Sequence, residues 1–108
     1  MDPHPIVVLI TTPSKEVAEQ IATSLLEKRL AACVNIIASV KSLFIWKGET
    51  CEDDEVLLVV KSRADLFEDQ IIPAVMEDHP YEVPEIIALP VMMGLQSYLD
   101  WINEVTDN

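Results

Sequence analysis

The sequence predicts an α+β domain in which two helices cover one face of a four-stranded antiparallel sheet. Three observations support this fold class. A run of β-branched residues lies near the N-terminus, alternating apolar positions occupy the middle of the chain, and helical periodicity follows the first and third strands. The length of 108 residues indicates one domain over residues 1–108, because a second core would leave each half too small.

Residues 6–11 form the first expected strand, and their unbroken apolar run predicts burial on both faces. A helix follows directly. It is capped either by Thr12 with Pro13 at the first helical position, or by Ser14 with Glu16 in the first turn. Its expected core-facing stripe recurs every third or fourth residue and consists of Val17, Ala18, Ile21, Ala22, Leu25 and Leu26.

A long hairpin is expected next. Residues 33–46 form its first strand, because the even positions from Val34 to Trp46 are mostly apolar. A strand of this length spans roughly 45 Å, whereas a compact domain of this size is roughly 35 Å across, so the strand should project beyond its core. Residues 47–54 are expected to form an acidic turn, and residues 55–62 a strongly apolar return strand.

The second half of the chain repeats the pattern of helix and strand. Residues 62–65 read Ser-Arg-Ala-Asp, a capping box that should open a second helix, which Pro73 kinks or restarts. Residues 79–84 form a rigid connector with two prolines, residues 86–90 an edge strand, and a closing helix follows Gly94. The resulting βαββαβ order with an extra C-terminal helix is that of ferredoxin-like folds.

This order leaves one face of the sheet without helices. Residues 7–10 and 56–60 nevertheless direct apolar side chains to both faces, and a large apolar surface is not tolerated in water. Another copy of the chain is the simplest cover, so we expect a homo-oligomer.

The charge and the short apolar runs exclude several classes of partner. Lys and Arg number 7 against 19 Asp and Glu, a formal net charge of -12, so nucleic acid and anionic membrane surfaces are repelled and cations are favoured. The run at residues 6–10 is too short for a signal core or a membrane span. Cys33 and Cys51 form neither a CxxC pair nor a disulfide framework, which predicts a cytoplasmic protein.

Four ordered blocks of the sequence are specific enough to indicate a family. They are Arg29-Leu30-Ala31-Ala32-Cys33-Val34-Asn35-Ile36, then Ser42-x-Phe44-x-Trp46-x-Gly48, then Glu55-Val56-Leu57-Leu58 with Lys61, and finally residues 79–86 continuing to Gly94 and Tyr98-Leu99-x-Trp101. Over nearly its whole length the chain resembles the CutA divalent-cation-tolerance proteins. The resemblance implies a cytoplasmic homotrimer with hairpins wrapped onto neighbouring subunits, a fold similar to PII nitrogen-regulatory proteins, and a role in tolerance of copper and other divalent ions.

The chain departs from the family at residues that bear on copper. In some bacterial members a cysteine in the first strand and two adjacent histidines before Pro-Tyr are proposed ligands. Here Ile10 stands at the first position and Asp78-His79 at the second, so one imidazole remains. Phe44 stands where members usually have tyrosine.

His79 is the candidate metal ligand, with Asp78 and Glu82 beside it in the sequence. A neutral imidazole is the commonest transition-metal ligand, and carboxylates complete many such sites. The structural alternative is a histidine that ends the second helix and hydrogen-bonds across a subunit boundary. No obligatory cofactor is expected, but Cu(II) or another divalent ion should bind weakly, because one imidazole falls short of a dedicated four-ligand site.

A second candidate site combines aromatic and charged residues. Trp46, Lys61, Tyr81 and Glu85 are expected to line an inter-subunit cleft that suits a small polar ligand, as in a PII-like signalling trimer. The alternative is a structural ion pair beneath two core aromatic rings.

An acylphosphatase-like enzyme on the same fold is the less favoured hypothesis. The connection at residues 11–14 has no glycine-rich anion cradle, and neither Arg29 nor Arg63 lies there. The chain also has no Ser-His-acid or Cys-His arrangement in a recognisable context. We therefore expect that the protein is not an enzyme.

Overall fold

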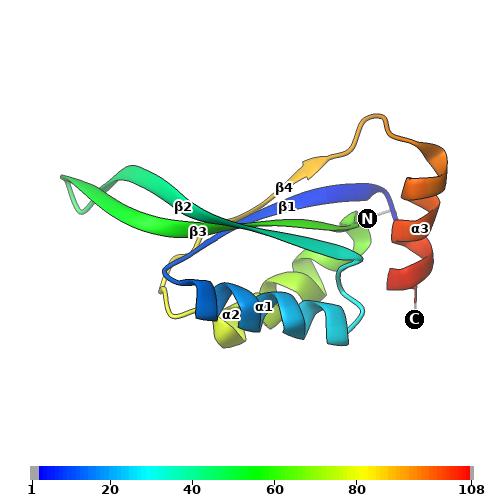
Figure 1. Ribbon diagram of the computed structural model, residues 1–108, viewed down its shortest axis with the longest axis horizontal. Coiled ribbons are helices and arrows are strands. Elements are labelled where there is room, and N and C mark those ends of the chain that lie inside the picture. Colours follow the sequence, from blue (N-terminus) through cyan, green and yellow to red (C-terminus); the bar gives the residue numbers. More distant parts are fainter. Residues whose placement is uncertain (1–2, 108) are drawn as a thin grey trace.

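A four-stranded antiparallel sheet in the order β2-β3-β1-β4 forms the centre of the molecule. The structure is a computed structural model and describes residues 3–107. Two helices cover one face of the sheet, and a third lies at the end opposite the hairpin tip (Figure 1). The predicted βαββαβ order with a closing helix is confirmed, and the elements are β1 (Pro5–Thr12), α1 (Lys15–Glu27), β2 (Cys33–Trp46), β3 (Glu49–Arg63), α2 (Ile72–Asp78), β4 (Ile86–Pro90) and α3 (Gln96–Thr106).

The core lies between the sheet and the layer of α1 and α2. In β1 every second residue is buried against these helices, and the residues between them are only half-buried. The prediction that this strand is buried on both faces is therefore wrong for the single chain, because α1 and α2 lie on one face and α3 lies at one end of the sheet (Figure 1). The largest side chains with no exposed surface in this core are Ile10, Ile21, Leu25, Leu58 and Ile71.

Helix α1 begins at one of the two predicted caps. Ser14 is extended, and its hydroxyl accepts a hydrogen bond from the Val17 backbone amide at 3.2 Å. The buried stripe consists of Ala18, Ile21, Ala22 and Leu25, whereas Leu26, predicted to belong to it, is exposed. Leu26 directly follows Leu25, which faces the core. Successive residues of a helix are rotated by about 100° around its axis, so the Leu26 side chain points toward solvent.

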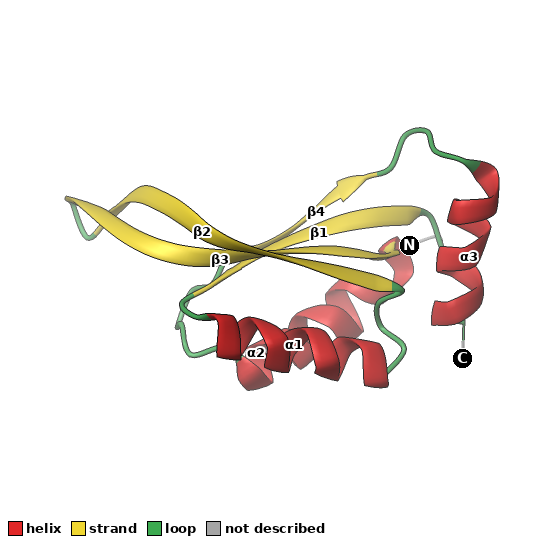
Figure 2. Cartoon of the chain, viewed as in Figure 1, coloured by secondary structure: helices red, strands yellow, loops and turns green. Residues whose placement is uncertain are grey.

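The hairpin of β2 and β3 projects beyond the helices, as predicted (Figure 2). Its turn is Lys47-Gly48, with φ of 51° and 81°, the positive pair that a two-residue hairpin turn requires. The predicted turn at residues 47–54 is therefore too long, since β3 begins at Glu49 and its acidic residues pair with β2. A bulge between Ile37 and Val40, with Ser39 at φ 65°, interrupts the pairing where the hairpin leaves the core.

The segment after β3 differs from the predicted capping box. The Ser62 hydroxyl is buried and donates to the Leu30 carbonyl at 2.6 Å, so it is not available to cap a helix. A 3₁₀ turn and a π-helical turn come first, over residues 64–71, and α2 begins only at Ile72. Pro73 lies in the first turn of α2, so the helix restarts there, which was one of the two predicted effects. Proline is tolerated at this position because a backbone N–H in the first turn would have no partner within the helix.

Candidate functional site

His79 follows α2 directly and is buried, with 7% of its surface exposed. The Tyr81 backbone amide donates a hydrogen bond to Nδ1 at 3.2 Å, so this nitrogen acts as an acceptor. In a neutral ring Nε2 then carries the proton and donates to the Thr11 carbonyl, 2.7 Å away. Both nitrogens are thus engaged within the chain, and the ring anchors the connector after α2 to the end of β1.

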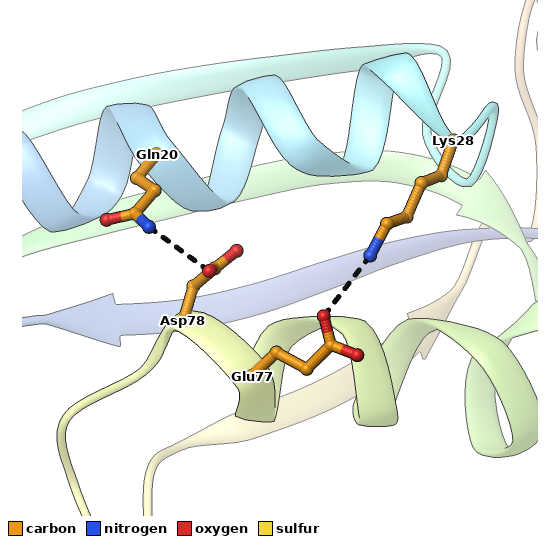
Figure 3. Close-up of polar contacts among 4 residues, drawn as sticks. All are labelled: Gln20, Lys28, Glu77 and Asp78. Carbon is orange, nitrogen blue, oxygen red and sulfur yellow. Dashed lines mark hydrogen bonds and ion pairs between the residues drawn. The ribbon is translucent and has the colours of Figure 1, made fainter.

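Asp78 and Glu82 do not join His79 in a common site. Asp78 accepts a hydrogen bond from the Gln20 side chain at 3.1 Å (Figure 3). It also lines a shallow polar hollow against α1. Glu82 lines a different cavity. Among residues 3–107 no three His, Cys, Asp or Glu side chains come close enough to hold a metal ion together. The structure therefore gives the predicted set of ligands no preformed geometry.

The larger cavity is a groove of about 1060 Å³ between the hairpin and the connector at residues 80–85, which we call the hairpin groove. It brings together three of the four residues predicted to share a cleft, Trp46, Tyr81 and Glu85. Lys61 is not among its lining residues, and its ammonium group instead donates to the Asn35 side chain on the neighbouring strand β2. The residues that the sequence prediction missed include Lys41, Phe44, Asp53 and Glu55.

Glu55 is the most buried acid in the described part of the chain, at 8% exposure. The Tyr81 hydroxyl donates to Glu55 Oε2 at 3.0 Å. Burial, together with this hydrogen bond and the negative charge of Glu55 and Asp53, raises the pKa of Tyr81 to about 12. The sequence contained one signal for Glu55. Side chains alternate between the two faces of a strand, so Glu55 lies on the same face as the apolar Leu57 and Val59.

Comparison with known proteins places the chain in a family. The family described as CutA1 divalent ion tolerance protein matches residues 6–105. The chain belongs to this family. The sequence prediction of a CutA relationship is therefore confirmed, as is the ferredoxin-like α+β fold.

Individual CutA relatives cover most of the chain. A divalent-cation tolerance protein CutA from Thermus thermophilus is 52% identical over 100 residues, 93% of this chain and 96% of the relative. A solved structure from the same organism has a TM-score of 0.90 at 51% identity and covers 93% of this chain and 96% of that one. The CutA structure from Archaeoglobus fulgidus, described as periplasmic, has a TM-score of 0.91 at 43% identity and covers 95% and 99% of the two chains.

Relatives from plants are longer and carry a different location in their names. A chloroplastic CutA from Arabidopsis thaliana is 41% identical over 103 residues, 95% of this chain but 56% of the relative. In this chain, no helix within residues 3–107 is long and apolar enough to cross a membrane.

Proposed function

We propose that this chain is a cytoplasmic homotrimer that contributes to divalent-cation tolerance by binding divalent ions weakly, without a catalytic role. The observation that carries this proposal is the family match across residues 6–105. Two unpaired cysteines, Cys33 and Cys51, are in keeping with a reducing compartment.

The uncovered face of the sheet and the projecting hairpin support the homotrimer. Large apolar side chains are exposed there, with Leu43 at 67% and Ile45 at 76% on the hairpin and Leu89 at 51% on β4. Burying such a surface against copies of the same chain removes it from water, and closed cyclic symmetry is the usual way to do so.

Weak metal binding is supported by the ligands that the chain offers. His79, Asp78 and Glu82 remain the proposed ligands, but His79 must first give up a hydrogen bond to Thr11 or to Tyr81. This exchange lowers the net affinity, because each lost bond offsets part of the coordination energy. Cu(II) should bind ahead of Zn(II), following the general order of first-row divalent ions.

Calorimetric titration of Cu(II) at pH 7.5 and 5.5 tests this proposal. We expect dissociation constants on the order of micromolar or weaker in the wild type, reduced binding at pH 5.5 because protons compete for the imidazole, and loss of the main site in His79→Ala. His4→Ala is the control for incidental binding near the N-terminus. Unchanged affinity and stoichiometry in His79→Ala would show that the ligands lie elsewhere.

We propose, as a second candidate function, that the protein binds a small effector in the manner of a PII-like signalling trimer. The specific support is the hairpin groove, which collects aromatic and acidic side chains from two separate segments. Its volume of about 1060 Å³ is slightly above the range of about 300–1,000 Å³ that is usual for small-molecule sites.

A further inference from the structure

We infer that the hairpin groove binds a small organic cation that carries ammonium groups, with the Glu55 carboxylate as its anchor. This inference rests on the second proposed function, ligand binding in the groove, and names the chemical class of the ligand.

The environment of Glu55 is the first argument. Its side chain lines the groove but is 92% removed from water. Among the described residues Tyr81 is its hydrogen-bond donor, and no basic side chain forms an ion pair with it. A buried carboxylate loses hydration and is normally compensated by a cation. The neutral hydroxyl of Tyr81 supplies one hydrogen bond but no charge, so in the described part of the chain no positive group is paired with this carboxyl group.

Most of the other charged residues of the groove are acidic. Asp53, Glu82 and Glu85 line it together with Glu55. Lys41 is its one basic lining residue, and the Lys41 ammonium group is paired with Glu52 Oε1 at 2.9 Å. The local field therefore attracts positive charge.

An organic cation fits this groove better than a metal ion does. A metal ion needs several donor atoms that converge within about 2.0–2.6 Å of one point, and no group of three suitable side chains does so in residues 3–107. An ammonium group needs one carboxylate and the face of an aromatic ring. Phe44, Trp46 and Tyr81 supply rings in the groove, and the Trp46 ring already has the Lys47 ammonium 6.0 Å from its centre.

The test titrates the full-length protein with 1,5-diaminopentane and with its neutral counterpart 1,5-pentanediol, by calorimetry. The variant is Glu55→Gln, which removes the charge but keeps the size of the side chain and an oxygen that accepts the Tyr81 hydroxyl. The control is Glu104→Gln, which makes the same charge change at an exposed position of α3. We expect the diamine to bind the wild type and Glu104→Gln alike, at least tenfold more weakly to Glu55→Gln, and in every protein more tightly than the diol.

A second measurement does not depend on the folding of the variant. In the ¹⁵N-labelled wild type, the diamine should shift the indole N–H signal of Trp46, which lines the groove, and leave that of Trp101 on α3 unchanged. Equal movement of both signals would overturn the assignment to the groove.

The outcomes separate this inference from the function on which it rests. Equal affinity for the diol and the diamine would show that the groove binds small molecules but that the cationic class is wrong. Equal weakening in Glu55→Gln and Glu104→Gln would reduce the effect to general surface charge and overturn the role of Glu55. Absence of binding by both probes, with the Trp46 signal unmoved, would overturn the inference and count against ligand binding in the groove.

Discussion

The hydroxyl of Tyr81 donates a hydrogen bond to Glu55 Oε2 at 3.0 Å, and this contact ties the connector after α2 to strand β3. The same connector is held at its start by His79, whose ring hydrogen-bonds the Thr11 carbonyl and packs 4.8 Å from the Tyr81 ring, centre to centre. One wall of the hairpin groove thus depends on two polar contacts formed by neighbouring residues.

The Tyr81 hydroxyl should make stability depend on pH in the alkaline range. Burial, chiefly, raises the pKa of Tyr81 in the folded protein from its usual value of 10.0 to about 12. Below pH 10 both states keep the proton and the stabilising contribution is complete. Between pH 10 and 12 the unfolded chain loses its proton first, so this contribution declines and is lost as pH passes the folded pKa.

Tyr81→Phe tests this linkage by guanidinium unfolding at pH 8 and 11.5. At pH 8 we expect a loss of roughly 1.5 kcal/mol, because Glu55 loses its donor. Between the two pH values the variant should lose less stability than the wild type. An identical alkaline loss in both proteins would show that Tyr81 does not carry this dependence.

Trp46→Ala should weaken subunit assembly. Trp46 is the last residue of β2 and is 46% exposed in the single chain. A neighbouring subunit can therefore bury much of its remaining exposed surface. We expect the wild type to sediment at about 36 kDa, three times the 12.1 kDa of one chain, and the variant to dissociate more readily by about 3 kcal/mol.

Sedimentation equilibrium over a range of concentrations and guanidinium unfolding measure this effect. Leu26→Ala is the matched control, because Leu26 is 42% exposed but lies on the helical layer rather than on the hairpin. A monomeric wild type would rule out the proposed assembly, and an unaltered trimer in Trp46→Ala would place the ring outside the interface.

Arg29→Gly should stabilise the protein. Arg29 follows α1 with φ 58°, and the amides of Leu30 and Arg29 bond the carbonyls of Leu25 and Leu26, the pattern of a Schellman motif. Glycine adopts this left-handed conformation without steric penalty, so we expect a gain of about 0.5–1 kcal/mol in the free energy of unfolding.

Thermal and denaturant unfolding check the sign of this change. The control is Glu27→Gly, which places glycine in the last helical residue of α1 and should destabilise by about 1 kcal/mol. A loss of stability in Arg29→Gly as large as in the control would show that Arg29 makes a contribution beyond its backbone conformation.

The elements that the sequence predicted best are those with a local signal. Strands β2 and β4 occupy the expected ranges because alternation and bounding prolines involve only neighbouring residues. The turn at Lys47-Gly48 was predicted too long. Acidic residues are uncommon in strands, so the acidic residues that follow Gly48 were assigned to the turn. In β3 they pair across a projecting hairpin, where both faces of the strand reach solvent.

The hairpin groove was predicted in part. Trp46, Tyr81 and Glu85 were grouped by residue type, and the structure places them in one groove. Lys61 was grouped with them on charge alone, but its position on β3 puts it opposite Cys33, near the start of β2 and far along the strand from the hairpin turn. Glu55 was missed, because its place on an apolar strand face hints at burial but does not show which distant side chain, here Tyr81, will cover it.

By itself the sequence determined the order of strands and helices, the length of strand β2 and the family, since periodicity and ordered motifs are carried by residues close together in the chain. Only the tertiary structure decided the partners of the polar side chains. His79 hydrogen-bonds Thr11, 68 residues away, and Tyr81 reaches Glu55 across 26 residues. These partners are brought together only when the connector packs on the sheet. A buried polar group that lacks a hydrogen bond is costly, so the folded chain forms these hydrogen bonds whatever the local sequence preference.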